Sequence, residues 1–222
     1  MKQAIQRIRS QVRHKVFIKN TRTPFGEPFN NDNHWVKTLH EYEGGVVDYR
    51  ESSLYKFHKN FCPDNIFDVA GIKKTSVESL LPLGSYPWGK WTNRKGSVEW
   101  SKSRHCGPSE DSLIEKEWND FISLFNKIKE EGLNYKKYGN PLGIFFINST
   151  QERFFIVLGG NHRAAIAYFL KEKVMPVRLL PRNYISNQVV KYKDVNQCNL
   201  SVKVFEYIVS NDFINWETKD HE

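Results

Sequence analysis

The hydrophobic pattern is sharpest between residues 109 and 132, where apolar side chains recur on one helical face: Leu113, Ile114, Trp118, Phe121, Ile122, Phe125 and Ile128. This spacing predicts an amphipathic helix. Ser112 and Glu115 fit a capping box at its start, where Glu110 and Asp111 also suit the helix dipole. Gly132 suits the end of the helix. We therefore expect one long helix packed against a core.

Shorter elements follow the predicted helix. The apolar runs Leu142–Ile147 and Arg153–Leu158 predict two strands, with a turn at 148–152 that makes them a hairpin. Two glycines and an asparagine then lead into a helix from His162 to Lys171, and Val174–Leu180 predicts a third strand. Pro176 lacks an N–H donor and suggests either an edge position in the sheet or an irregular start of the strand. The order helix–strand–strand–helix–strand predicts an α+β fold, a small mixed β-sheet with packed helices.

The rest of the chain has a weaker pattern. The expected elements are a helix that passes into a strand near 16–18, a loop at 20–34, a strand near 45–49, a short helix near 76–81, a loop at 82–108, and weak strands near 188–193 and 200–207. We therefore divide the chain into an N-terminal extension with an aromatic and basic loop (1–107), a core (108–182) and a C-terminal extension packed on the core (183–222).

Composition narrows the class of protein. The 222 residues suffice for one large domain with a true hydrophobic core. No apolar stretch reaches the roughly 18 residues of a spanning helix, and no apolar run near the N-terminus resembles a secretory signal. Cys62, Cys106 and Cys198 are too far apart for a C-x-x-C pair and do not suggest a disulfide framework. We therefore expect a cytoplasmic protein.

The net charge of +8 favours anionic partners. Residues 1–19 alternate basic and apolar side chains, which suits peripheral contact with a membrane surface, and a solvated helix explains the same pattern. The loop at 82–108 interleaves aromatic and basic side chains: Tyr86, Trp88, Lys90, Trp91, Arg94, Lys95, Trp100 and Lys102. Such side chains can stack on rings and hold phosphates, so we expect part of this loop to line an acceptor pocket.

The segment F-F-I-V-L-G-G-N-H-R at 154–163 carries the most chemical information. A strand ends in Gly159 and Gly160, and Asn161 can cap the helix that follows. Free N–H groups at a helix start bind anions, and glycines let a ligand approach the backbone. His162 and Arg163 add side-chain donors. A tight strand–helix turn with a solvated arginine explains the same residues, so both interpretations stay open.

The sequence L-G-G-N-H-R-A-A at 158–165 resembles the nucleotide-binding motif of the ParB/sulfiredoxin superfamily. Sulfiredoxins carry G-G-C-H-R at this place, and ParB-like free serine kinases carry D-G-H-H-R. The preceding helix, the strand and the later V-M-P-V-R-L extend the resemblance over residues 108–180. It implies a ParB/sulfiredoxin-like core that binds ATP or another nucleoside triphosphate, usually with Mg²⁺. The implied nucleotide contacts are Gly159, Gly160, Asn161, His162 and Arg163.

The chain also departs from these relatives. Asn161 stands where sulfiredoxins place their catalytic cysteine, so sulfinic-acid reduction is not expected. Gly159 stands where the kinases place an aspartate. The segment after Pro181 is too short for the helix-turn-helix and dimerisation parts of ParB partition proteins. We therefore expect no sequence-specific binding to nucleic acid.

Phosphoryl transfer needs a carboxylate near the acceptor hydroxyl. The helix start offers Glu110, Asp111, Glu115 and Glu117, of which we select the first three together with His162 as the catalytic candidates. Acids in a first turn also stabilise a helix without any catalytic role. Arg104 lies just upstream and is a further candidate for the phosphates.

The leading hypothesis is a nucleotide-dependent phosphotransferase that acts on a small hydroxylated acceptor such as a sugar, a lipid-linked glycan or an amino acid. The alternative is a nucleotide-binding module that binds nucleic acid, either without catalysis or with nucleotide hydrolysis. The net charge and the aromatic loop favour this alternative, and the missing DNA-reading motif disfavours it. A ParB-like nuclease has no specific support in the residues.

Overall fold

The computed structural model describes residues 13–63, 65–70, 106–180, 189–191 and 200–211. The strands are β1 (Arg13–Phe17), β2 (Thr21–Arg22), β3 (Leu142–Ile147), β4 (Arg153–Gly159), β5 (Val174–Leu179) and β6 (Val189–Lys191). The α-helices are α2 (His34–Glu43), α3 (Ser53–Asn60), α4 (Ile66–Val69), α6 (Asp111–Glu131), α7 (Tyr135–Tyr138), α8 (Asn161–Phe169) and α9 (Leu200–Asn211). Short 3-10 helices occupy Ile18–Asn20 and Tyr49–Glu51.

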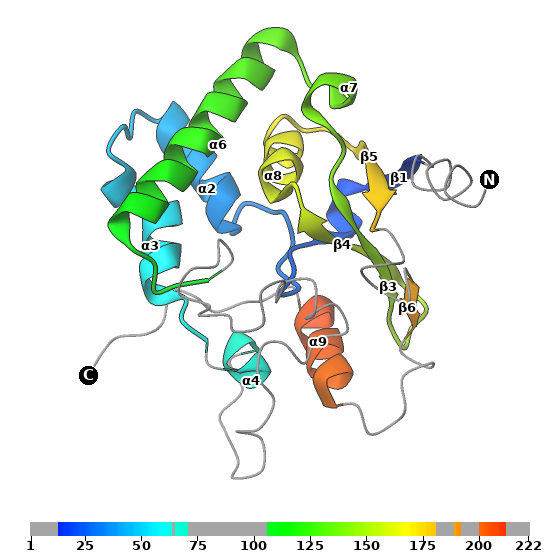
Figure 1. The fold of residues 1–222 in the computed structure, drawn as a ribbon. Coiled ribbons are helices and arrows are strands. Elements are labelled where there is room, and N and C mark those ends of the chain that lie inside the picture. The colour runs from blue at the N-terminus through cyan, green and yellow to red at the C-terminus, as the bar shows by residue number, and fades with distance from the viewer. Residues whose placement is uncertain (1–12, 64, 71–105, 181–188, 192–199, 212–222) are drawn as a thin grey trace, which may run out of the picture.

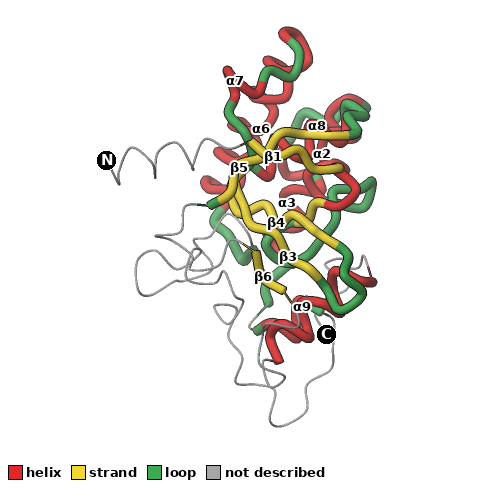
Figure 2. The backbone as a smooth tube through the Cα atoms, turned by 90° about the vertical axis from the view of Figure 1, so that its right-hand side faces the viewer, coloured by secondary structure: helices red, strands yellow, loops and turns green. Residues whose placement is uncertain are grey.

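The strands form one mixed sheet in the order β1-β5-β3-β4-β2 (Figure 2). The β3–β4 and β1–β5 pairs are antiparallel, whereas β2–β4 and β3–β5 are parallel. β5 and β6 pair with different parts of β3. β5 pairs with its first two residues, Leu142 and Gly143, and β6 pairs with its last three, Phe145–Ile147. This arrangement confirms the predicted α+β class with a small mixed sheet and packed helices.

The two faces of the sheet build two apolar clusters. One contains Ile144, Phe146, Phe154, Ile156 and Leu158, and the other contains Phe145, Phe155 and Val157. This separation follows from the alternation of side chains along a strand. The helices α2, α6 and α8 cover the second face, and α4 and α9 cover the first. The sheet is therefore the middle of three layers.

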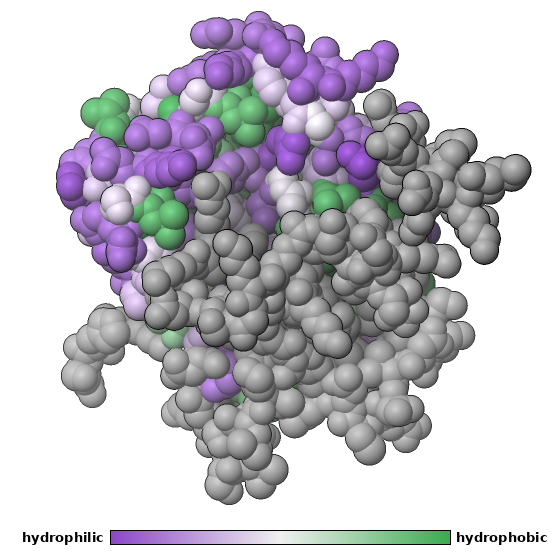
Figure 3. All heavy atoms as spheres, viewed as in Figure 1, coloured by the Kyte–Doolittle hydropathy of each residue, from purple (hydrophilic) through white to green (hydrophobic). Residues whose placement is uncertain are grey.

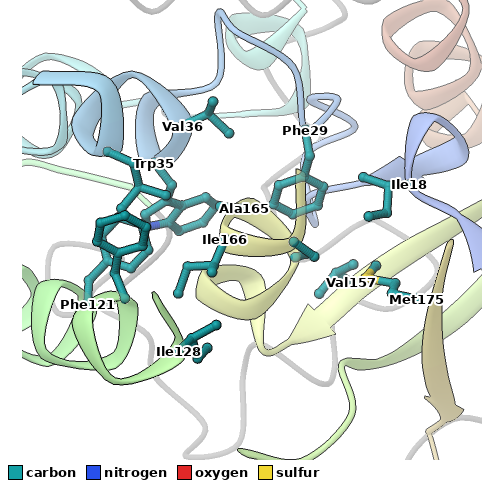
Figure 4. Close-up of a cluster of buried hydrophobic side chains, with 14 of the residues drawn as sticks. Ile18, Phe29, Trp35, Val36, Phe121, Ile128, Val157, Ala165, Ile166 and Met175 are labelled. Atoms are coloured by element: carbon teal, nitrogen blue, oxygen red, sulfur yellow. The ribbon is translucent and has the colours of Figure 1, made fainter. Parts of the chain in front are cut away.

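The cluster around α8 positions the residues of the candidate site described below. Figure 4 shows Trp35 from α2 and Phe121 from α6 beside Ile166 of α8. Ala165 and Ile166 are fully buried, so α8 lies closely against both the sheet and its neighbouring helices. The outer surface over α6 and α7 is mainly hydrophilic (Figure 3). The amphipathic pattern of α6 therefore separates core from solvent as predicted.

Several predicted elements agree with the structure. The β3–β4 hairpin, its turn and the strand near residue 16 are confirmed, and Gly132 ends α6 with φ +79°. β6 lies within the weak strand predicted near 188–193. Pro176 is not on an edge strand, but β5 pairs with β3 only through Arg178 and Leu179, so Pro176 has a neighbouring strand on one side.

Other predicted details are wrong. α6 begins at Asp111 with Glu110 as N-cap and no side-chain cap, so Ser112 and Glu115 form no capping box. The predicted strand near 45–49 is a turn followed by a 3-10 helix, and the strand predicted near 200–207 is part of α9. Both apolar runs are short, and a short run does not distinguish a strand from a buried helix. The sequence also failed to predict α2, α3, α4 and α7.

Residues 20–34 form mainly turns as predicted, but they are not a surface loop. Residues 21–29 are all buried. Backbone bonds from Thr23 N–H to Glu27 O (2.8 Å) and from Gly26 N–H to Thr23 O (3.0 Å) satisfy part of this loop internally. Phe25 and Phe29 enter the two different apolar clusters. The loop therefore belongs to the core.

The helix predicted near 76–81, the loop residues 82–105 and residues 1–12 lie outside the described residues. Within the described parts, no helix is both long enough and apolar enough to cross a membrane.

Candidate functional site

The turn between β4 and α8 has the geometry of an anion site. Gly160 is the N-cap of α8 and lies in the left-handed region (φ +88°, ψ +31°), which a glycine adopts without strain. The helix begins at Asn161, so Asn161 is its first residue and not the predicted N-cap. No side chain caps α8, and its first N–H groups are therefore available to a ligand.

A pocket of about 350 Å³ opens at this turn, within the usual size range of small-molecule sites. Its walls are Trp35, Glu117, Leu124, Tyr138, Leu158, Gly159, Gly160, Asn161, His162 and Arg163. The five motif residues that the sequence predicts as nucleotide contacts thus all line one pocket.

The side chain of Arg163 lies between the β4–α8 turn and the end of α7. Its Nη1 donates a hydrogen bond to the carbonyl oxygen of Tyr138, which lies at the end of α7. A Cβ built on Gly160 would lie 2.6 Å from Nη2 of Arg163, and one on Gly139 would lie 2.8 Å from Nη1. Glycine at both positions therefore makes room for the guanidinium.

Arg163 has no carboxylate partner among the described residues. Burial lowers the pKa of its guanidinium from the ordinary value. A half-buried cation without a counter-ion is costly, and an anionic ligand would compensate it. Arg163 therefore marks this end of the pocket as a place for a negative charge.

Glu117 and His162 form a hydrogen-bonded pair at the same pocket. Nε2 of His162 lies 2.7 Å from Oε1 of Glu117. The Glu117 side chain is only 4% exposed, and that of His162 is 18% exposed. A carboxylate can only accept, so the proton between them lies on Nε2 and the lone pair of the neutral imidazole lies on Nδ1. Glu117 thereby fixes both the tautomer and the orientation of His162.

Aromatic rings hold the His162 imidazole from the sides. The ring of Phe121 lies 4.6 Å from it between centroids, and the indole of Trp35 meets it edge-on at 6.0 Å. These contacts come from α6 and α2, the two helices that pack against α8 in Figure 4. The imidazole is therefore fixed by packing as well as by its hydrogen bond.

Glu27 and His34 form a second buried pair, close enough to the first for His162 and Glu117 to affect His34 electrostatically. Nδ1 of His34 is 3.4 Å from Oε2 of Glu27, and the His34 ring stacks on Phe57 at 3.5 Å. Burial raises the pKa of Glu27 from 4.5 to about 8. A hydrogen bond from the backbone N–H of His34 and the positive charge of Lys37 oppose this shift. Burial, and then the nearby His162, lower the pKa of His34 well below its usual value. Burial therefore favours the neutral forms of both Glu27 and His34.

Among the buried polar atoms of the pocket residues, the indole Nε1 of Trp35 and the Oδ1 of Asn161 have no hydrogen-bond partner in the described structure. The two residues are 3% and 7% exposed. Unpaired buried polar groups are rare and costly. Their position in the pocket wall suggests that a polar ligand or water completes their hydrogen bonding.

The predicted carboxylates at the start of α6 lie apart from this pocket. Glu110 and Glu115 are exposed. Asp111 binds Nζ of Lys59 at 2.6 Å, which lowers the pKa of Asp111. None of the three lines the pocket, and Glu117 is the α6 carboxylate that does. Arg104 lies outside the described residues.

Glu117 had a recognisable signal in the sequence. It lies three residues after Ile114 and four before Phe121, and thus on the apolar face of α6. An acid on the buried face of a helix needs a partner, whereas acids in the first turn do not. Trp35, His34 and Glu27 had no comparable signal, because their part of the chain has little periodicity.

The described residues contain no group of three or more His, Cys, Asp or Glu side chains suited to a metal ion. Mg²⁺ often binds through the phosphates of its nucleotide, waters and one or two carboxylates. Glu117 is the one acid in the pocket wall, and it is already bonded to His162. These residues therefore fit a Mg²⁺ ion that arrives with a nucleotide better than a resident metal.

Comparison with known proteins adds no assignment. No family model, curated protein sequence or solved structure matches this chain.

Proposed function

We propose that the protein binds a nucleoside triphosphate at the β4–α8 turn and transfers a phosphoryl group to a small hydroxylated acceptor. The observation that carries this proposal is that one pocket contains both an anion site and a hydrogen-bonded carboxylate–imidazole pair. Gly160 and Arg163 supply the first, and Glu117 and His162 supply the second.

The phosphates would lie at the free N–H groups of α8, beside the guanidinium of Arg163. Gly159 leaves space for this approach, since a Cβ built on it would come no nearer than 3.8 Å to another residue. Bound Mg²⁺ would neutralise charge on the phosphates. The resemblance to the ParB/sulfiredoxin superfamily supports the same placement, because its nucleotide motif corresponds to these residues.

The acceptor would lie on the His162 side of the pocket. Trp35, Leu124 and Leu158 give this pocket apolar walls, while Tyr138 adds an aromatic ring. Such walls suit the faces of a sugar or the carbon skeleton of an amino acid, with its hydroxyl directed at the phosphate. ATP is the nucleotide to test first, since the pocket residues do not distinguish one base from another.

Arg163→Ala is expected to weaken nucleotide binding by about 1.5–3 kcal/mol, the usual contribution of a charged hydrogen bond. Isothermal titration calorimetry with Mg·ATP measures this loss. Arg178→Ala is the matched control, because Arg178 is exposed on β5 and does not line the pocket. Equal affinities of a folded Arg163→Ala protein and the wild type would show that the phosphates do not bind at this turn.

The alternative function is nucleotide-dependent binding to nucleic acid, which the net charge of +8 favours. Under the phosphotransferase proposal, DNA and RNA should bind only non-specifically. The affinity should then fall by orders of magnitude between about 50 and 200 mM salt, as counterion release requires. Fluorescence anisotropy with labelled DNA and RNA at several salt concentrations measures this affinity. Tight binding to one sequence at physiological salt would favour the nucleic-acid module.

A further inference from the structure

We propose that His162 is a covalent phosphoryl carrier, whose Nδ1 accepts the terminal phosphoryl group of the nucleotide before the acceptor receives it. This inference deepens the proposed function and rests on it. Its basis is the juxtaposition of an oriented imidazole with an anion site on consecutive residues of α8.

The free nitrogen of His162 is Nδ1. Nε2 is bound to Glu117, whereas Nδ1 has no hydrogen-bond partner among the described residues and is not one of their fully buried polar atoms. The residue lines the pocket, and Phe121 holds its ring at 4.6 Å. Nδ1 is therefore an accessible nucleophile with a fixed lone pair.

The surroundings favour a phosphoryl group on Nδ1 over a proton. Nδ1 belongs to the second residue of α8, near the positive end of the helix and next in sequence to Arg163. A general base would place a new positive charge there, which the helix dipole and the guanidinium oppose. Phosphorylation also leaves the ring positive, but the phosphoryl oxygens add more negative charge than the ring gains in positive charge, and the helix dipole and the guanidinium stabilise that negative charge.

Glu117 completes the chemistry of the carrier. Attack by Nδ1 leaves the ring with a proton on Nε2 and a positive charge, and the Glu117 carboxylate stabilises that charge across 2.7 Å. Its burial strengthens this interaction. The second buried pair, Glu27 and His34, provides no competing anion near neutral pH, because Glu27 stays largely protonated there.

The two steps balance. In the first, the bond from Nδ1 to the γ-phosphorus forms, the bond from that phosphorus to the β,γ-bridging oxygen breaks, and the nucleoside diphosphate leaves with the electron pair. In the second, the acceptor hydroxyl oxygen attacks the phosphorus and the N–P bond breaks. Its electron pair returns to Nδ1, and the hydroxyl proton passes to solvent. No oxidant or reductant is needed.

The test is to incubate the full chain, without acceptor, with Mg²⁺ and each of the four γ-³²P-labelled ribonucleoside triphosphates. We expect one nucleotide to label the protein through a bond that is stable in alkali and lost in acid. Peptide mapping of the labelled wild type should place the label on His162. The protein should also exchange isotope between labelled nucleoside diphosphate and its triphosphate.

His162→Asn and His162→Gln should each lose the label and the exchange completely. His40→Asn is the matched control and should keep both, because His40 is an exposed residue of α2 outside the pocket. Thermal melting establishes that the variants are folded. Since the label is mapped in the wild type, the test does not depend on either variant folding.

Calorimetry on the same samples separates the two proposals. Nucleotide binding without any acid-labile label would overturn the carrier and leave the proposed function standing. A label on a residue other than His162 would also overturn it. If no nucleotide binds, the proposed function fails, and the carrier fails with it.

Discussion

Glu117→Gln is expected to lower the rate of phosphoryl transfer by about 10²- to 10⁴-fold, between the smallest usual effect of a positioned acid or base and the loss seen when a catalytic histidine loses its carboxylate partner. The amide keeps the shape of the side chain but carries no charge. It can also offer its NH₂ group to Nε2, which would hold His162 in the wrong tautomer. Nucleotide affinity should change little, because the proposed phosphate contacts are made by Gly160 and Arg163.

The comparison variants are Glu110→Gln, Asp111→Asn and Glu115→Gln, which test the first turns of the same helix. All three residues lie outside the pocket, so turnover per folded molecule should stay near the wild-type value. Asp111→Asn also removes an ion pair with Lys59, but this pair is exposed to solvent and its loss should change stability little. Full turnover in Glu117→Gln would exclude this role of Glu117, and loss of turnover in one of the other three variants would assign the required carboxylate to the start of α6.

The buried Glu27 should make the protein less stable as the pH rises. Its pKa is about 8 in the folded protein and near 4.5 in an unfolded chain. The folded state therefore holds a proton that the unfolded state has released, and the free energy of unfolding falls with pH between these values. Below pH 6.5 the depressed pKa of His34 acts in the opposite direction. The fall should thus be clearest between pH 6.5 and 8, at about 1.4 kcal/mol per pH unit.

Urea unfolding at several pH values measures this slope. Glu27→Gln replaces the carboxyl by a group that cannot ionise, and it should abolish the slope between pH 6.5 and 8. Glu130→Gln is the matched control, since Glu130 is exposed on α6, and its slope should equal that of the wild type. An unchanged slope in folded Glu27→Gln would show that another group is responsible.

The fold could be predicted where local pattern and tertiary packing agree. The α6 stripe and the β3–β4 hairpin combine strong periodicity with clear turn residues, and both are present. α2 was missed because its apolar positions are interrupted by polar ones that turn out to be buried, such as His34 and Thr38. The β-branched residues after residue 200 favour a strand, yet this segment forms helix α9.

The site could be predicted only in part, for a similar reason. The motif from Gly159 to Arg163 is contiguous, so its residues share one turn whatever the rest of the fold. Glu117 and Trp35 reach that turn from two other helices, and their proximity depends on how α6 and α2 pack against α8. Sequence favoured the acids at the start of α6 because they suit a helix terminus, but that preference is local and does not show which acid faces α8.

The pairing of β1 with β5 also bears on how the chain folds during synthesis. Arg13 pairs with Arg178, and Thr21 pairs with Phe155, so the first two strands find their neighbours only after most of the chain has left the ribosome. Contacts between such distant residues slow folding, and strand edges left unpaired meanwhile invite association between chains. β1 and β2 therefore stay without their sheet neighbours until the residues of β5 and β4 have also been synthesised.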